Sequence, residues 1–150
     1  MRMAMVLFVG VVCVAGVRAQ VPKETSPDRR YGFEVDLENY PQATPQDTVK
    51  SVLTALNRNQ VAYLLAQLTD PAWVDQRVKG LGGNFEDLVK EVSSKLSANP
   101  GAIRDLQRFA NDGKWDVKGD TATGSLEDIK DRQVFLRKVG NRWFLENRNK

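Results

Sequence analysis

The fold of this chain is decided by the stretch Arg132-Gln-Val-Phe-Leu-Arg-Lys-Val-Gly-Asn-Arg-Trp-Phe-Leu-Glu-Asn147. It predicts two strands joined by Gly140-Asn141, because Gly followed by Asn suits a two-residue hairpin turn whose first central residue needs a positive φ. Such a turn pairs Val139 with Arg142 and fixes the register of the hairpin. Side chains alternate along a strand, so one face of the hairpin is apolar. That face carries Val134, Leu136, Trp143 and Leu145, and we expect helices to cover it.

The chain before this hairpin has the apolar periodicity of amphipathic helices. Thr44-Pro45-Gln46-Asp47 opens the first one, with Thr44 as the N-cap and Pro45 at the first helical position. Another is predicted from about Gln60 to Leu68. Three more begin at Asp70-Pro71, Asn84 and Asn99-Pro100. The glycine-rich stretch 79–83 fits no phosphate-binding pattern, so we interpret it as a connection.

From Trp115 onward the apolar period shortens to every second residue, which is typical of strands. Strands are predicted around Trp115–Val117 and Ala122–Leu126, ahead of the hairpin. Helices first and an antiparallel four-strand meander last predict an α+β fold, in which N-terminal helices pack on a curved C-terminal sheet. With 150 residues, the chain has room for one domain, which we place at residues 44–150.

Residues 1–19 have the pattern of a Sec-type signal peptide. Arg2 gives the basic start, residues 4–16 are apolar, and Val17-Arg18-Ala19 is a small-x-small motif, so we predict cleavage after Ala19. The apolar run is shorter than the roughly 20 residues of a spanning helix, so no membrane span is expected after cleavage. The sequence therefore predicts a secreted or periplasmic protein.

Residues 20–43 are predicted to form a tether and an extended arm. The first part, residues 20–30, is polar and contains proline. Apolar side chains then alternate along Tyr31, Phe33, Val35 and Leu37, which indicates a short strand or an arm docked on the domain. A binding motif for a partner is the alternative. We favour docking, because alternating apolar residues are usually buried in their own domain.

The composition excludes several kinds of chemistry. The chain has no His, and its one Cys is Cys13 in the leader. The cleaved protein therefore has no thiol nucleophile, no disulfide and no imidazole, which excludes zinc sites and His-based acid–base catalysis. A site for Ca²⁺ or Mg²⁺ made only of carboxylates stays open, although EF-hand spacing is absent. We name no metal site and expect no cofactor.

Charge is nearly balanced once the leader is removed. Of 22 basic residues, Arg2 and Arg18 lie in the leader, which leaves 20 against 19 acidic residues. We therefore expect no nucleic-acid partner. Basic residues still gather near the C-terminus, and the candidates for binding an anion are Arg137, Lys138 and Arg142. The alternative is that they form the solvated side of strands whose other face is apolar.

The layout of residues 44–147 resembles the nuclear transport factor 2-like superfamily, also called the cystatin-like α+β cone. Three features carry the resemblance, and the last is common in exported uncharacterised bacterial members. They are the opening Thr44-Pro45-Gln46-Asp47-Thr48-Val49, the helix Val61-Ala62-Tyr63-Leu64-Leu65-Ala66-Gln67-Leu68 ending at Asp70-Pro71, and the closing Phe135-Leu136-Arg137-Lys138-Val139-Gly140-Asn141-Arg142-Trp143-Phe144-Leu145. The resemblance implies a cone-shaped fold, in a superfamily that includes isomerases, dehydratases, polyketide cyclases and non-catalytic binding domains. Since its His–Asp dehydratases need a His, that chemistry does not carry over.

Tyr63 and Asp116 are the weak candidates for catalysis. An isomerase-like site would use a carboxylate as the base and a tyrosine as the oxyanion donor. Asp70 and Asp75 are further acids of the same region. The favoured alternative places Tyr63 at the edge of the core and makes the acids helix caps or solvated positions.

Three tryptophans, Trp73, Trp115 and Trp143, are candidates for lining a ligand pocket, or else they fill the core between helices and sheet. Taken together, the sequence predicts an exported, non-catalytic accessory or binding domain of the cell envelope. Its partner would be a small apolar ligand or an envelope protein, and a homodimer through the open face of the sheet is a further expectation. The alternative is a small isomerase- or cyclase-type enzyme that uses a Tyr/carboxylate pair.

Overall fold

The computed structural model describes residues 28–148. The predicted signal peptide and the first part of the predicted tether lie outside these residues. Within residues 28–148, no helix has the length and apolar character needed to cross a membrane.

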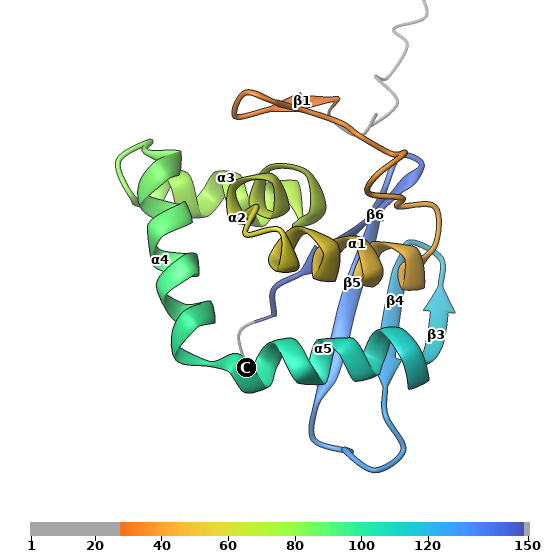
Figure 1. Ribbon diagram of the computed structural model, residues 1–150. Helices are drawn as coiled ribbons and strands as arrows, with labels where there is room; N and C mark the ends of the chain where they lie inside the picture. The colour runs from red at the N-terminus through yellow and green to blue at the C-terminus, as the bar shows by residue number, and fades with distance from the viewer. Residues whose placement is uncertain (1–27, 149–150) are drawn as a thin grey trace, which may run out of the picture.

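The described chain follows the predicted order of helices first and strands last (Figure 1). Two very short strands come first, β1 (Arg29–Arg30) and β2 (Phe33–Glu34). The helical part comprises α1 (Pro45–Asn57), α2 (Val61–Tyr63), a π-helical turn η1 (Leu64–Leu68), α3 (Pro71–Gly80), α4 (Phe85–Ala98) and α5 (Pro100–Asp112). The sheet comprises β3 (Lys114–Lys118), β4 (Thr121–Ser125), β5 (Gln133–Val139) and β6 (Arg142–Glu146), antiparallel in the order β3-β4-β5-β6. The α+β fold with helices packed on a strand meander is confirmed.

The organising hairpin has the predicted register. Val139 pairs with Arg142 and Leu136 pairs with Leu145, around a turn in which Gly140 has φ +60°. Leu136 is fully buried and belongs to a core cluster with Val49 of α1. Figure 1 shows α1 and α5 crossing the face of β4 and β5. The expectation that helices cover the apolar face of the hairpin is therefore confirmed.

Side chains cap three of the helices where the sequence predicts. The side chain of Thr44 accepts the N–H of Asp47 at 3.1 Å, as expected for an N-cap. Asp70 caps α3 by accepting the N–H of Ala72, and Asn84 caps α4 in the same way. Asp70 is therefore a helix cap, as the favoured alternative holds.

Two helix boundaries differ from the sequence prediction. The helix expected over residues 60–68 is a short α2 followed by the wider turn η1. All residues of η1 are buried, and the apolar spacing of such a run does not distinguish a π turn from an α turn. The connection expected at 79–83 begins later, because α3 continues to Gly80. It then closes through the N–H of Gly83, which donates to the carbonyl of Val78 at 2.9 Å.

The arm docks on the helices. β1 and β2 form a small hairpin whose turn, Tyr31-Gly32, has positive φ at both positions. The ring of Tyr31 stacks on Phe85 of α4 with 4.2 Å between centroids. Arg30 forms an ion pair with Asp75 of α3. These contacts place the arm against α3 and α4, where it joins the wall of the domain.

Candidate functional site

A cavity of about 750 Å³ opens between α3, α4 and α5 and the ends of β5 and β6. Its lining is contributed by helices and strands that are far apart in the sequence. The apolar lining consists of Val52, Leu56, Leu64, Leu65, Trp73, Val92, Leu96, Ala102, Ile103, Leu106, Phe109, Val134, Phe135 and Leu145. Two other hollows, about 770 and 760 Å³, lie beside the arm and have fewer apolar side chains. The first cavity is therefore the best candidate for holding an apolar molecule.

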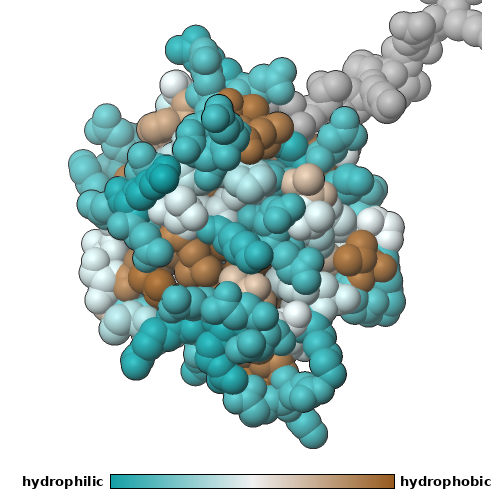
Figure 2. Space-filling model, turned by 45° about the vertical axis from the view of Figure 1, so that its right-hand side comes forward, coloured by the Kyte–Doolittle hydropathy of each residue, from teal (hydrophilic) through white to brown (hydrophobic). Residues whose placement is uncertain are grey.

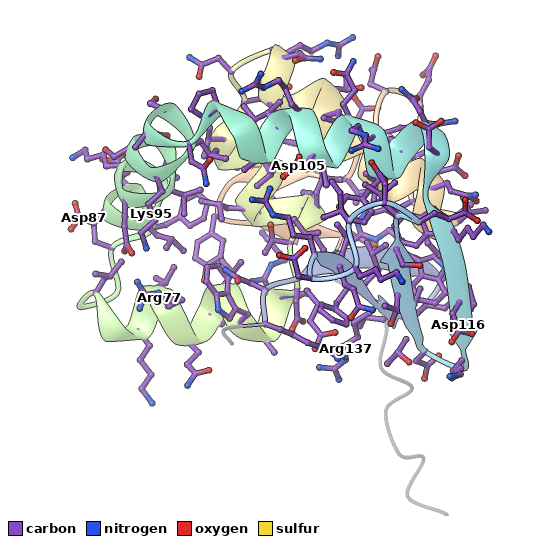
Figure 3. All side chains as sticks on the ribbon, turned by 90° about the horizontal axis from the view of Figure 1, so that it is seen from below. Arg77, Asp87, Lys95, Asp105, Asp116 and Arg137 are labelled. Atoms are coloured by element: carbon purple, nitrogen blue, oxygen red, sulfur yellow. The ribbon has the colours of Figure 1, made fainter. Side chains whose placement is uncertain are left out.

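Charged side chains also line this cavity, on α5 and on the segments that flank the strands. Asp105 of α5 forms an ion pair with Arg132, which precedes β5. Glu146 at the end of β6 forms a second pair with Arg148, with 3.1 Å between carboxylate oxygen and Nε. Figure 3, which views the molecule from below, shows Asp105 on the side of α5 that faces the rest of the domain. The cavity is thus apolar over most of its wall and charged along one part.

The connection from β4 to β5, residues 126–132, is held to α5 by ion pairs. Arg108 of α5 binds Asp128 at 2.7 Å, and Asp105 binds Arg132. The hydrogen bond from Arg108 lowers the pKa of Asp128. Since Arg132 lines the cavity, this connection forms part of its wall. Exposed pairs of this kind each contribute only about 0–1 kcal/mol. They therefore hold residues 126–132 to α5 only weakly.

The three tryptophans have different environments. Trp73 is half-buried and lines the cavity. Trp143 is 4% exposed, and Trp115 packs beside it in the core cluster under α1 and α5. The indole nitrogen of Trp115 is buried and finds no hydrogen-bond partner among residues 28–148. The structure therefore places one of the three at the cavity and two in the core.

The structure does not bring Tyr63 and Asp116 together. The hydroxyl of Tyr63 accepts the N–H of Asp36 at 3.1 Å, and its ring packs against Tyr40 with 4.4 Å between centroids. Burial raises the pKa of Tyr63. Asp116 is exposed on β3, where it pairs with Lys118 at 2.9 Å. Figure 3 shows Asp116 at the far end of the domain from α3 and α4, and neither residue lines the cavity.

The proposed anion cluster is divided between two faces of the hairpin. Arg137 is exposed on the face away from α1 and α5. Lys138 lies on the opposite face, with its ammonium 5.9 Å from the ring centroid of Trp143. Arg142 is only 4% exposed, and burial lowers the pKa of its guanidinium. These three cations therefore do not form one surface site.

Arg142 instead belongs to a buried polar network that the sequence analysis missed. Its Nη1 donates to the side-chain oxygens of Gln42 and Gln67, both at 3.1 Å. Gln67 also donates to the carbonyl of Phe33 at 2.7 Å, and Gln42 donates to the carbonyl of Trp143 at 2.8 Å. The network joins the arm, η1 and β6. The one available signal was a glutamine inside the apolar run 61–68.

No protein-family model, curated protein or solved structure matches this chain. Within residues 28–148, no group of three or more acidic, cysteine or histidine side chains is arranged to hold a metal ion. The molecule is thus defined by its α+β fold and by one largely apolar cavity with charged side chains in its wall.

Proposed function

We propose that this chain is an exported, non-catalytic binding domain that holds a small apolar or amphipathic molecule in the cavity between its helices and β5–β6. The cavity itself carries the proposal. Its volume of about 750 Å³ falls within the range of about 300–1,000 Å³ typical of small-molecule sites, which are also mostly apolar with a few polar groups. Membership of the nuclear transport factor 2-like superfamily is part of the proposal and rests on the residues quoted above.

Binding is favoured over catalysis by the placement of the polar groups. Acid–base chemistry needs a base and a partner that converge on one reacting atom. Tyr63 and Asp116 have separate surroundings, and Asp105 and Glu146 each hold an arginine at the cavity. The Tyr/carboxylate enzyme therefore gains no support from this arrangement.

Export and assembly complete the proposal. Export rests on the signal-peptide pattern of residues 1–19. An envelope protein partner and a homodimer through the open sheet face remain proposals. Figure 2 shows the apolar side chains of one face in separate patches among hydrophilic ones. Sedimentation of the cleaved protein distinguishes a monomer from a dimer.

A thermal-shift measurement on residues 20–150 with alkyl alcohols tests the binding function. A ligand present at about 100 times its dissociation constant stabilises the protein by about 2.7 kcal/mol. Ala102 is exposed on α5 and lines the cavity, so Ala102→Trp should fill part of it and reduce the shift. Ala72→Trp is the matched control, since Ala72 is an exposed helical alanine that does not line the cavity.

Two outcomes would count against the proposal. One is the absence of a saturable shift with every alcohol tested. The other is an equal shift in Ala102→Trp and Ala72→Trp, which would place any binding elsewhere on the molecule.

A further inference from the structure

The charged side chains in the cavity wall indicate which polar head group an amphipathic ligand carries. Two ion pairs contribute to it, Asp105 with Arg132 and Glu146 with Arg148. In both pairs the arginine is the more exposed partner. The side chains of Arg132 and Arg148 are 60% and 46% exposed, whereas both carboxylate side chains are 23% exposed. A head group that approaches from solvent therefore meets guanidinium groups first.

Both guanidinium groups keep hydrogen-bond donors for a ligand. A guanidinium has five N–H donors in a planar fork that matches a carboxylate. Arg132 reaches Asp105 through Nη1 alone, and Arg148 reaches Glu146 through Nε and Nη2. The guanidinium of Arg148 also lies 4.2 Å from the ring centroid of Phe135, which lines the cavity. Arg148 therefore sits where the apolar and charged parts of the wall meet.

The start of α5 adds to this preference for an anion. Asn99, Ala102 and Ile103 line the cavity at this helix end. The side chain of Asn99 makes no capping hydrogen bond within the described residues. Backbone N–H groups at a helix start favour negative charge.

The total charge of the wall explains how such an anion would be recognised. The wall has three carboxylates, Asp105, Asp131 and Glu146, against the two arginines. Long-range attraction for an anion is therefore absent. Selectivity has to come from directed, charge-assisted hydrogen bonds with the guanidinium groups.

We infer that the cavity binds an amphipathic carboxylate, with its alkyl chain among the apolar side chains and its carboxylate on Arg132 and Arg148. This inference rests on the proposed binding function and adds the chemical class of the ligand. The apolar contacts with side chains such as Leu96, Leu106 and Phe135 hold the chain. The two arginines orient it with its charged end toward solvent.

Dodecanoate, dodecanol and dodecylamine test this inference, because they share one alkyl chain and differ only in the head group. Each is titrated into the cleaved protein by calorimetry, below the micelle concentration of the two charged compounds and below the solubility limit of dodecanol. We expect dodecanoate to bind about tenfold or more tighter than dodecanol, as for one or two hydrogen bonds with charged groups. Dodecanol or dodecylamine binding as tightly as dodecanoate would overturn the inference.

Variants identify the source of the preference. Arg132→Gln with Arg148→Gln should bring the affinity for dodecanoate down to that for dodecanol, with both ligands measured on the same variant. Arg137→Gln is the matched control, because Arg137 is exposed on β5 and does not line the cavity. Asp105→Asn should increase the preference, since it frees Arg132 from its carboxylate. Arg148→Gln alone leaves the ion pair of Arg132 with Asp105 intact. It therefore measures how much of the preference for dodecanoate comes from Arg132.

The outcomes separate this inference from the proposed function. Binding of dodecanol without any preference for dodecanoate would support the binding function and overturn the carboxylate class. A preference that survives in Arg132→Gln with Arg148→Gln would also overturn it. Failure of all three compounds to bind would overturn both.

Discussion

At the scale of single residues, Gly124 of β4 shows how closely the inner face of the sheet is packed. A Cβ at this position would lie 2.8 Å from Cη2 of Trp115. The ring packs against the core cluster that contains Leu136, as Val134 does. We expect Gly124→Ala to lower the free energy of unfolding by about 1–3 kcal/mol, the usual effect of overpacking.

Gly80→Ala is the matched control for this prediction. A Cβ at Gly80 meets nothing within 4 Å, and alanine in a helix is favoured over glycine by about 0.5–1 kcal/mol. Chemical denaturation of both variants measures the difference. Equal stability of Gly124→Ala and the unsubstituted protein would contradict the packing of Trp115 on Gly124.

The surroundings of several single residues could not be predicted from the sequence. Trp73, Trp115 and Trp143 are one residue type, and no local pattern separates a tryptophan that lines a cavity from one inside the core. Their roles follow from the neighbours that the fold brings to them. The same holds for Gln42 and Gln67, which are ordinary polar residues in sequence and fully buried partners of Arg142 in the structure.

At the scale of elements, the hairpin of β1 and β2 depends on one acid of α3. Burial acts to raise the pKa of Asp75, but hydrogen bonds from Arg30 and Tyr31 outweigh it and lower that pKa below its usual value of 3.8. A lowered pKa gives stability that is present above the unfolded pKa and lost as pH falls through the folded one. We therefore expect the arm to loosen as the pH falls below about 4. Amide exchange of Val35, which donates to the carbonyl of Asp28, measures this.

The same contact should also weaken in alkali, because the pKa of Tyr31 is raised whereas the pKa of Asp75 is lowered. Burial, together with the hydrogen bond to Asp75, raises the pKa of Tyr31 from 10.0 to about 12. A raised pKa gives stability that is complete below the unfolded value and lost as pH rises through the folded value. The arm should therefore also loosen between pH 10 and about 12. Asp75→Asn should abolish the faster amide exchange of Val35 in acid. Faster exchange in acid that persists in this variant would mean that another group causes it.

Elements were the most predictable level of this structure. Caps such as Thr44 and Asn84 act through local hydrogen bonds, so their sequence signals identified the helix starts. The turn Gly140-Asn141 gave the register for the same reason. The π turn η1 could not be predicted, because the apolar spacing of a fully buried run does not distinguish a π turn from an α turn. The burial of Phe144 could not be predicted either. Phe144 is fully buried on the face of β6 opposite Trp143, and the guanidinium of Arg142 lies 4.9 Å from its ring centroid.

At the scale of the whole molecule, the cavity is the feature that sequence analysis could not supply. Its wall combines residues as distant as Leu56 and Glu146, and it lies where α4 and α5 meet the ends of β5 and β6. Trp73 was the one lining residue that the sequence analysis named as a candidate for a pocket, and the other apolar lining residues carried no separate signal for one.

The first measurement is an NMR titration of residues 20–150 with dodecanol, whose neutral head group makes the result independent of the inferred carboxylate preference. We expect saturable shifts at the amides of residues whose side chains line the cavity, such as Leu96, Ile103, Leu106 and Phe135. Shifts confined to the arm, or no saturable shift at any amide, would contradict the claim that this cavity is the functional site.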